Sequence, residues 1–152
     1  MKACVKCGIK AHMKTILVAV DGSEPSLKGA RLAVPLAQAV GARIELVYVI
    51  PPVLLPPSVY AETIARLEEN NQQVAKEALS KGAAAVKEAG GESDSVMVHG
   101  SPAEAIADLA LADRVWGVVV AAKSHSVVSR VMLGSTTDRL VHISVKPVLV
   151  VR

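Results

Sequence analysis

KTILVAVDGSEPS, residues 14–26, is the stretch of the sequence that decides the fold. It opens with an almost continuous apolar run, which is typical of a strand covered on both faces of a sheet. The run ends in Asp21-Gly22-Ser23, and a helical pattern begins at once, with Ser23 as a candidate N-cap and Pro25 in the first turn. A buried strand that leads directly into a helix predicts the first unit of an α/β sheet.

The same alternation of strand and helix continues along the chain. Buried strands are predicted at residues 14–20, 42–50, 95–99, 116–122 and 147–151. Helices are predicted at residues 24–40, 58–89, 102–113 and 135–143. One apolar stripe along the longest helix consists of Tyr60, Ile64, Leu67, Val74, Ala78 and Ala85. This order predicts a single doubly wound α/β domain with a parallel sheet, helices on both faces and right-handed crossovers.

Composition excludes several classes of protein. The 152 residues are enough for one domain, and a hydrophobic fraction of 51% is enough for one buried core. No apolar run reaches the roughly 18 residues that a membrane span requires. The net charge of +3 comes from scattered basic residues and aromatic residues make up only 2% of the chain, so a nucleic-acid partner is not expected. The first residues lack the apolar segment of a secretory signal, and we therefore expect a cytoplasmic protein.

Cys4 and Cys7 form a C-x-x-C pattern near the N-terminus, and His12 follows them. A structural zinc site normally takes four ligands, and a redox dithiol normally opens a helix within a βαβ unit, so neither chemistry is favoured. The simpler alternative is that residues 1–12 are an N-terminal extension, derived from a vector or from a start codon placed too early. We expect the folded domain to span residues 13–152.

A long loop follows the fourth predicted strand and leads to the last helix. Its sequence, AAKSHSVVSRVMLGS at residues 121–135, contains Lys123, His125 and Arg130 and ends in a Gly-Ser turn at the predicted helix start. A strand, a cationic loop and a helix N-terminus in this order can seat a phosphate chain on backbone N–H groups. The loop therefore indicates an anion-binding edge of the sheet.

Taken together, four segments of the chain resemble the universal stress protein family, and the likeness covers residues 13–152. The segments are ILVAVDGS at 16–23, ELVYVI at 45–50, VHGSPAEAI at 98–106, and SRVMLGSTTDRLV at 129–141 with the KPVLVV that follows at 146–151. The resemblance implies a five-stranded parallel sheet in the order 3-2-1-4-5, an adenine nucleotide alpha hydrolase-like fold. Its ligand site would lie at the topological switch point between the first and fourth strands.

The resemblance also implies an ATP site, which is degenerate in this chain. ATP-binding members carry G-x2-G-x9-G-[ST] after the fourth strand, and alignment on Gly134 and Ser135 places Ala121 and Ser124 at the two earlier glycines. If the backbone φ is negative at these positions, the added Cβ costs little, whereas a positive φ would cost about 1–2 kcal/mol. The resemblance thus implies ATP as a possible ligand, with Mg²⁺ only if ATP binds, and AMP or another adenine compound stays open as the alternative.

The family's site maps onto ten positions: Ala19, Val20, Asp21, Val49, Ala121, Ser124, Gly134, Ser135, Thr136 and Thr137. The resemblance implies that Asp21 meets the ribose or the base and that the backbone of Val49 reads the adenine edge. The turn that begins at Gly134 would hold the phosphates. The plain alternative is that Asp21 only caps a turn, Ser135 only caps a helix and Lys123 is a solvated loop residue.

Three functions remain open. The first is a homodimeric stress-response regulator with a degenerate ATP site, and the second is a dimeric module that does not bind nucleotide. The third is a slow ATPase or self-phosphorylating protein, which is not favoured because the loop supplies no base or carboxylate beyond Asp21 and His125. No catalytic residue is assigned, and His99 and His142 are expected to be structural. The implied dimer pairs two copies of the fifth strand, Val148–Val151, antiparallel, which would satisfy the backbone groups of that edge.

Overall fold

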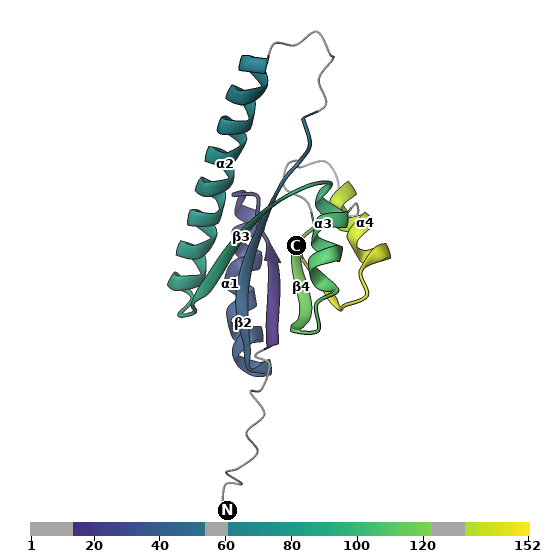
Figure 1. Cartoon of the computed structure of the whole chain (residues 1–152). Coiled ribbons are helices and arrows are strands. Elements are labelled where there is room, and N and C mark those ends of the chain that lie inside the picture. The colour runs from purple at the N-terminus through teal and green to yellow at the C-terminus, as the bar shows by residue number, and fades with distance from the viewer. Residues whose placement is uncertain (1–13, 54–60, 123–132) are drawn as a thin grey trace, which may run out of the picture.

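The computed structural model describes residues 14–53, 61–122 and 133–152 of the 152-residue chain, in which strands and helices alternate (Figure 1). The strands are β1 (Lys14–Ala19), β2 (Ala42–Ile50), β3 (Ser93–His99), β4 (Val115–Ala121) and β5 (Val148–Val151). The helices are α1 (Glu24–Val40), α2 (Ala61–Glu88), α3 (Pro102–Ala110) and α4 (Ser135–Ile143). The predicted boundary between residues 12 and 13 lies outside the described residues.

All five strands form one parallel sheet in the order β3-β2-β1-β4-β5, which confirms the predicted fold. β1 lies in the middle, where Val18 pairs with Leu46 of β2 on one side and with Val119 of β4 on the other. The chain therefore leaves β1 toward one edge of the sheet and later returns to its other side. Such a reversal opens a crevice beyond the carboxyl ends of the central strands.

Helices cover both faces of the sheet, α1 and α2 on one face and α3 and α4 on the other (Figure 1). Alternate residues of β1 supply the two cores: Ile16 and Val18 pack in the core of the α1 and α2 face, and Leu17 packs in the core of the opposite face. All three side chains are fully buried. Burial on both faces explains why the sequence of this strand is continuously apolar rather than alternating.

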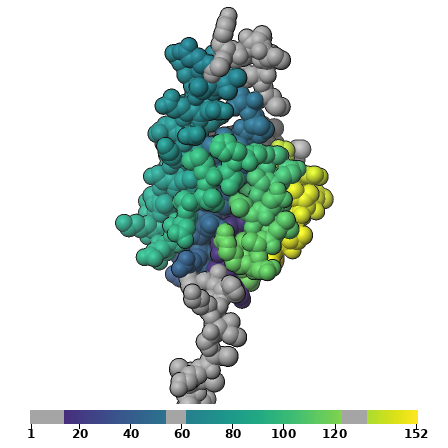
Figure 2. All heavy atoms as spheres, in the orientation of Figure 1, coloured from purple at the N-terminus to yellow at the C-terminus, as the bar shows by residue number. Residues whose placement is uncertain are grey.

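The buried face of α2 differs from the predicted stripe. Ala75 is fully buried whereas Val74 is 44% exposed, so the assignment of Val74 to the stripe is wrong by one position. The helix lies close to β2 at Gly82, where an added Cβ would lie 3.1 Å from Leu46 Cδ1. The N-terminal end of α2 extends beyond the carboxyl ends of the strands (Figure 1). In the space-filling view, the teal atoms of this end stand above the main body of the molecule (Figure 2). Neither α2 nor any other helix of the described residues is long and apolar enough to cross a membrane.

Two details of the helix ends also correct the predictions. α3 ends at Ala110 rather than near residue 113, because the Leu111 N–H bonds to Asp108 O at 3.1 Å and tightens the last turn. Ser23 occupies the N-cap position of α1, but its side chain makes no capping hydrogen bond to the helix. Its hydroxyl instead bonds within the turn that follows β1, and that turn forms part of the candidate site.

Candidate functional site

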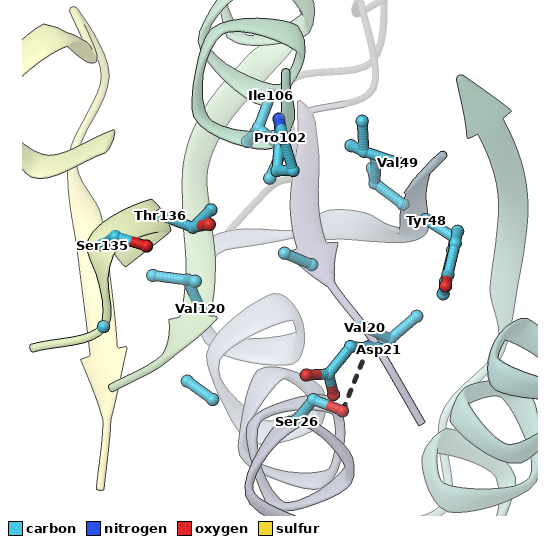
Figure 3. Close-up of a pocket in the computed structure, with 14 residues that line it drawn as sticks. Val20, Asp21, Ser26, Tyr48, Val49, Pro102, Ile106, Val120, Ser135 and Thr136 are labelled. Carbon is cyan, nitrogen blue, oxygen red and sulfur yellow. Dashed lines mark hydrogen bonds between the residues drawn. The ribbon is translucent and has the colours of Figure 1, made fainter. Parts of the chain in front are cut away.

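A pocket of about 360 Å³ opens at the carboxyl ends of β1, β2 and β4, beside the first turns of α3 and α4 (Figure 3). It lies at the switch point of the sheet, the usual ligand position in open α/β folds. Apolar side chains form much of the wall, and a few polar groups converge on it. The lining residues are Ala19, Val20, Asp21, Ser26, Val47, Tyr48, Val49, Pro102, Ile106, Val120, Ala121, Gly134, Ser135 and Thr136.

Of the ten predicted site residues, all but Ser124 and Thr137 line this pocket. Ser124 lies outside the described residues. Thr137 belongs to α4 but is only 3% exposed and does not line the pocket. The fold thereby brings together segments that are far apart in the sequence, since Asp21 follows β1, Val49 is near the end of β2 and Ser135 begins α4.

The pocket has two chemically different sides (Figure 3). Ser135 and Thr136 present hydroxyl groups on the α4 side, whereas Val49 and Tyr48 stand on the β2 side, and Asp21 lies between them. A ligand with a flat apolar part, a polar middle and an anionic end would match this order of groups.

Asp21 holds the turn between β1 and α1. Its Oδ1 accepts hydrogen bonds from the Ser23 N–H at 2.9 Å and from the Ser23 hydroxyl at 2.5 Å. The Ser26 hydroxyl accepts from the Asp21 N–H at 3.3 Å and donates to Ser23 O at 2.9 Å. Asp21 therefore does make the local turn that the plain alternative proposed, and this turn also places its carboxylate in the pocket.

Tyr48 lines the pocket although the sequence analysis did not single it out. Burial, and secondarily the negative charge of Asp21, raise the pKa of the Tyr48 phenol above its usual value of 10.0, so the hydroxyl is neutral at physiological pH. It can therefore donate a hydrogen bond to a ligand. The only available signal was its position in the apolar run at residues 46–50 of β2, and such a run does not reveal which of its residues reach a pocket at the end of the strand.

Ala121 stands where the resemblance placed a loop glycine, and its backbone is regular β-strand. It is the last residue of β4 and pairs with Val151 of β5. Strand backbone has a negative φ, so the Cβ of Ala121 causes no left-handed strain. Its carbonyl accepts a hydrogen bond from Thr137 Oγ1 at 2.7 Å, which ties the end of β4 to α4.

The first turn of α4 forms the polar side of the pocket. Gly134 is the N-cap residue and Ser135 is the first residue of the helix, so the alternative in which Ser135 is the cap does not hold. The Gly134 N–H donates to Ala122 O at 2.6 Å. The N–H groups of Ser135 and Thr136 have no partner within the helix, because a first turn has no preceding carbonyls, and the helix dipole adds positive potential there.

The remaining candidates for chemistry lie away from the pocket or outside the described residues. His99 ends β3 and His142 lies in α4, and neither lines the pocket. His142 Nδ1–H donates to the Asp138 carbonyl at 2.7 Å, one turn earlier in the same helix. The residues that fall outside the described part are Cys4, Cys7, His12, Lys123, His125 and Arg130, and what was predicted for them stays a prediction.

Comparison with known proteins identifies similar chains along nearly the whole length. Residues 12–152 match the model of the Universal stress protein family. A protein of Thermus aquaticus described as a universal stress protein is 32% identical over 141 residues, which are 91% of this chain and 98% of that one. The solved structure of the universal stress protein UspA from Lactobacillus plantarum is 25% identical and has a TM-score of 0.79, over 94% of this chain and 100% of that chain.

More distant solved structures include nucleotide complexes. A universal stress protein in complex with cAMP is 23% identical, with a TM-score of 0.65 over 93% of this chain and 99% of that chain. The universal stress protein from Archaeoglobus fulgidus in complex with dAMP is 21% identical, with a TM-score of 0.66 over 92% and 98% of the two chains. An Arabidopsis thaliana family member with AMP bound is 18% identical, with a TM-score of 0.62 over 90% of each chain. At these identities the likeness shows a shared fold.

Proposed function

Because this chain belongs to the universal stress protein family, we propose that it is a regulatory binding protein whose switch-point pocket takes an adenine nucleotide. In this proposal the bound nucleotide changes the surface that a protein partner meets, and the function is binding rather than catalysis. The protein would act in the cytoplasm as a homodimer, and Mg²⁺ would enter only together with ATP.

One observation carries the proposal: Asp21, Val49 and the first turn of α4 meet around a single pocket. Pro102 and Ile106 add apolar surface beside Val49 that would suit a base. The Asp21 carboxylate can accept hydrogen bonds from ribose hydroxyls, and the α4 N-terminus favours an anion. That proteins of the same fold are described as complexes with AMP, cAMP and dAMP supports adenine as the base.

The test is to look for the nucleotide directly and then to titrate it. Mass spectrometry of denatured, freshly purified protein would detect a co-purifying adenine nucleotide. Calorimetric titration of the ligand-free protein with AMP, and with ATP and Mg²⁺, would then measure affinity, and we expect a dissociation constant in the micromolar range.

Asp21→Asn is the variant that tests the position of the ligand. Asparagine keeps the acceptor oxygen that holds the turn but removes the charge, and we expect about tenfold weaker nucleotide binding from the loss of a charge-assisted hydrogen bond. Asp94→Asn is the matched control, because Asp94 is exposed at the start of β3, whereas the pocket lies beyond the carboxyl ends of the strands. If no adenine nucleotide co-purifies or binds at millimolar concentration, the nucleotide-independent module replaces this proposal.

The homodimer in this proposal uses the β5 edge. β5 is the last strand in the sheet order, so within the described residues its outer edge has no paired strand. Leu149 of β5 is 44% exposed, and Val141 of α4 and Val145 between α4 and β5 are 43% and 69% exposed. Antiparallel pairing with a second β5 would satisfy the edge backbone groups and bury these apolar side chains.

A further inference from the structure

We propose that Ser26 is a positioning residue of the candidate site: its buried hydroxyl acts through the turn after β1 and fixes the Asp21 carboxylate in the pocket. This inference rests on the proposed function, because it gives a role toward the same ligand to a residue that was not among the ten predicted positions. Three observations support it: the burial of Ser26, the hydrogen bonds that join it to Asp21, and the packing of the turn against α2.

Ser26 is one of the three buried polar side chains in the described part of the chain and is 3% exposed. A hydroxyl group that is removed from water is stable only when it is hydrogen-bonded. The Ser26 hydroxyl accepts a hydrogen bond from the Asp21 N–H at 3.3 Å and donates its single proton to Ser23 O at 2.9 Å. Although Ser26 belongs to the pocket lining, this proton is therefore committed to the turn rather than offered to a ligand.

The same turn orients the carboxylate. Asp21 Oδ1 accepts hydrogen bonds from the Ser23 N–H at 2.9 Å and from the Ser23 hydroxyl at 2.5 Å. Ser23 O also accepts from the Leu27 N–H at 3.0 Å, which is the first hydrogen bond of α1. A continuous set of hydrogen bonds thus runs from α1 through Ser26 and Ser23 to the carboxylate. Loss of the Ser26 hydroxyl would break this set at the Asp21 backbone.

Ser23 gives up a stabilising contact to take part in this arrangement. It occupies the N-cap position of α1, where a serine hydroxyl normally accepts a hydrogen bond from a backbone N–H of the first turn. Its hydroxyl donates to Asp21 instead and makes no capping bond. Departure from a local stability rule is typical of functional sites, and here the departure serves the orientation of a carboxylate.

On its other side the turn is packed against α2. Gly22 has a φ of +80°, and a Cβ added to it would lie 3.3 Å from Ala78 Cβ and 3.4 Å from Ala78 Cα. The turn therefore cannot shift far toward the helix. Without the hydrogen bonds of Ser26, the movement left to Asp21 is away from α2, and its carboxylate would leave the position in which it accepts from a ligand hydroxyl.

A double-mutant cycle on the full chain tests this role, with AMP as the calorimetric probe. Ser26→Ala should weaken AMP binding about tenfold when Asp21 is present, because a displaced carboxylate loses its hydrogen bond to the ligand. In the Asp21→Asn background, where the charge is already removed, Ser26→Ala should change AMP affinity by less than about twofold. A residue that only supports the fold would weaken binding equally in both backgrounds.

Ser23→Ala is the second variant, because it removes the hydroxyl bond to Asp21 at a partly exposed position and costs α1 no capping bond. It should show the same dependence on Asp21, and it decides the test if circular dichroism shows that Ser26→Ala is unfolded. Ser80→Ala, at an exposed position of α2, is the matched control and should leave AMP affinity unchanged in both backgrounds.

The outcomes separate this inference from the proposed function. If the unmodified chain binds AMP and the serine variants weaken binding equally in both backgrounds, or in neither, the positioning role is overturned and the nucleotide site stays in place. Losses confined to the chain that keeps Asp21 would support the role. Absence of AMP binding by the unmodified chain at millimolar concentration would overturn the proposed function and this inference together.

Discussion

The backbone conformation of Ala121 predicts the effect of restoring glycine at this position. Since Ala121 ends β4 in regular pairing with Val151, replacing it by glycine removes no strain and adds conformational freedom to the unfolded chain. We expect Ala121→Gly to lower the free energy of unfolding by about 0.5–1 kcal/mol without tightening nucleotide binding. Urea unfolding and calorimetric titration measure the two quantities. Tighter binding by Ala121→Gly alone would show that its Cβ obstructs the ligand, and Ser124→Gly serves as the comparison at the other lost glycine.

Thr137 does not line the pocket, and its contribution is to the stability of the pocket wall rather than to ligand contact. Its hydroxyl donates to Ala121 O at 2.7 Å, and the side chain is 3% exposed. Thr137→Val keeps the shape but removes the donor for this carbonyl, so we expect a loss of about 1–3 kcal/mol in the free energy of unfolding. Chemical denaturation measures it, and Thr63→Val at an exposed position of α2 is the matched control. Equal stability of the two variants would mean that water replaces the lost donor.

Comparison of individual residues shows which parts of the site could be predicted from the sequence and which could not. Asp21, Val49 and Ser135 were predicted from the family resemblance, whose motifs are local and contiguous, and the fold brings all three to the pocket. Tyr48 was not predicted, since the continuous apolar run at residues 46–50 gives no periodicity that singles out a pocket residue. The role of Thr137 could not be predicted either, because its partner lies 16 residues away along the chain.

At the scale of elements, Glu104 joins the first turn of α3 to the middle of α4. Its carboxylate accepts hydrogen bonds from the Ser101 hydroxyl at 2.5 Å and from Arg139 Nε at 3.0 Å. The Ser101 hydrogen bond, followed by the one from Arg139, lowers the pKa of Glu104 below its usual value of 4.5. A carboxyl with a lowered pKa in the folded state contributes stability that is fully present above pH 4.5 and is lost as the pH falls through the folded-state pKa.

The corresponding variant is Glu104→Gln, which cannot ionise. We expect it to lose less stability than the unmodified chain when the pH is lowered from 4.5, although it starts from a slightly lower stability at neutral pH. Urea midpoints measured across this range would show the difference. Glu69→Gln on the exposed surface of α2 is the control and should keep the acid sensitivity of the unmodified chain. Identical acid profiles for all three proteins would remove Glu104 as a source of that sensitivity.

The order of elements was predictable for a physical reason, and the orientation of α2 was not. Buried strands, glycine stops and proline starts are local signals, so their alternation predicted the parallel sheet that the structure has. The rotation of α2 about its axis depends on how closely the helix approaches β2. The valine at position 74 suggested a buried site, whereas the close approach selects Ala75 and Gly82.

At the scale of the whole molecule, the pocket and the β5 edge share one peptide segment. The Ala122 N–H donates to Val151 O at 2.8 Å, and the Ala122 carbonyl accepts from the Gly134 N–H at 2.6 Å. The start of α4 and the end of β5 are therefore both fixed by the same residue. A variant that tests the edge should leave Val151 in place, since its buried side chain packs in the core and a change there would disturb the end of β5 that holds Ala122.

Leu149 meets this requirement and tests the proposed dimer. It lies in β5 but is 44% exposed, and a second β5 paired antiparallel would bury it in both copies. Loss of two such leucine contacts, at about 1.5 kcal/mol each, should raise the dimer dissociation constant about a hundredfold in Leu149→Asp. Sedimentation equilibrium measures this constant for the unmodified chain and for the variant, with circular dichroism to verify that both are folded. Leu111→Asp is the control, because Leu111 is 60% exposed at the end of α3 and belongs to no part of the proposed interface. An unmodified chain that is monomeric at micromolar concentration would exclude the β5 dimer, and equal weakening by both substitutions would assign the interface to another surface.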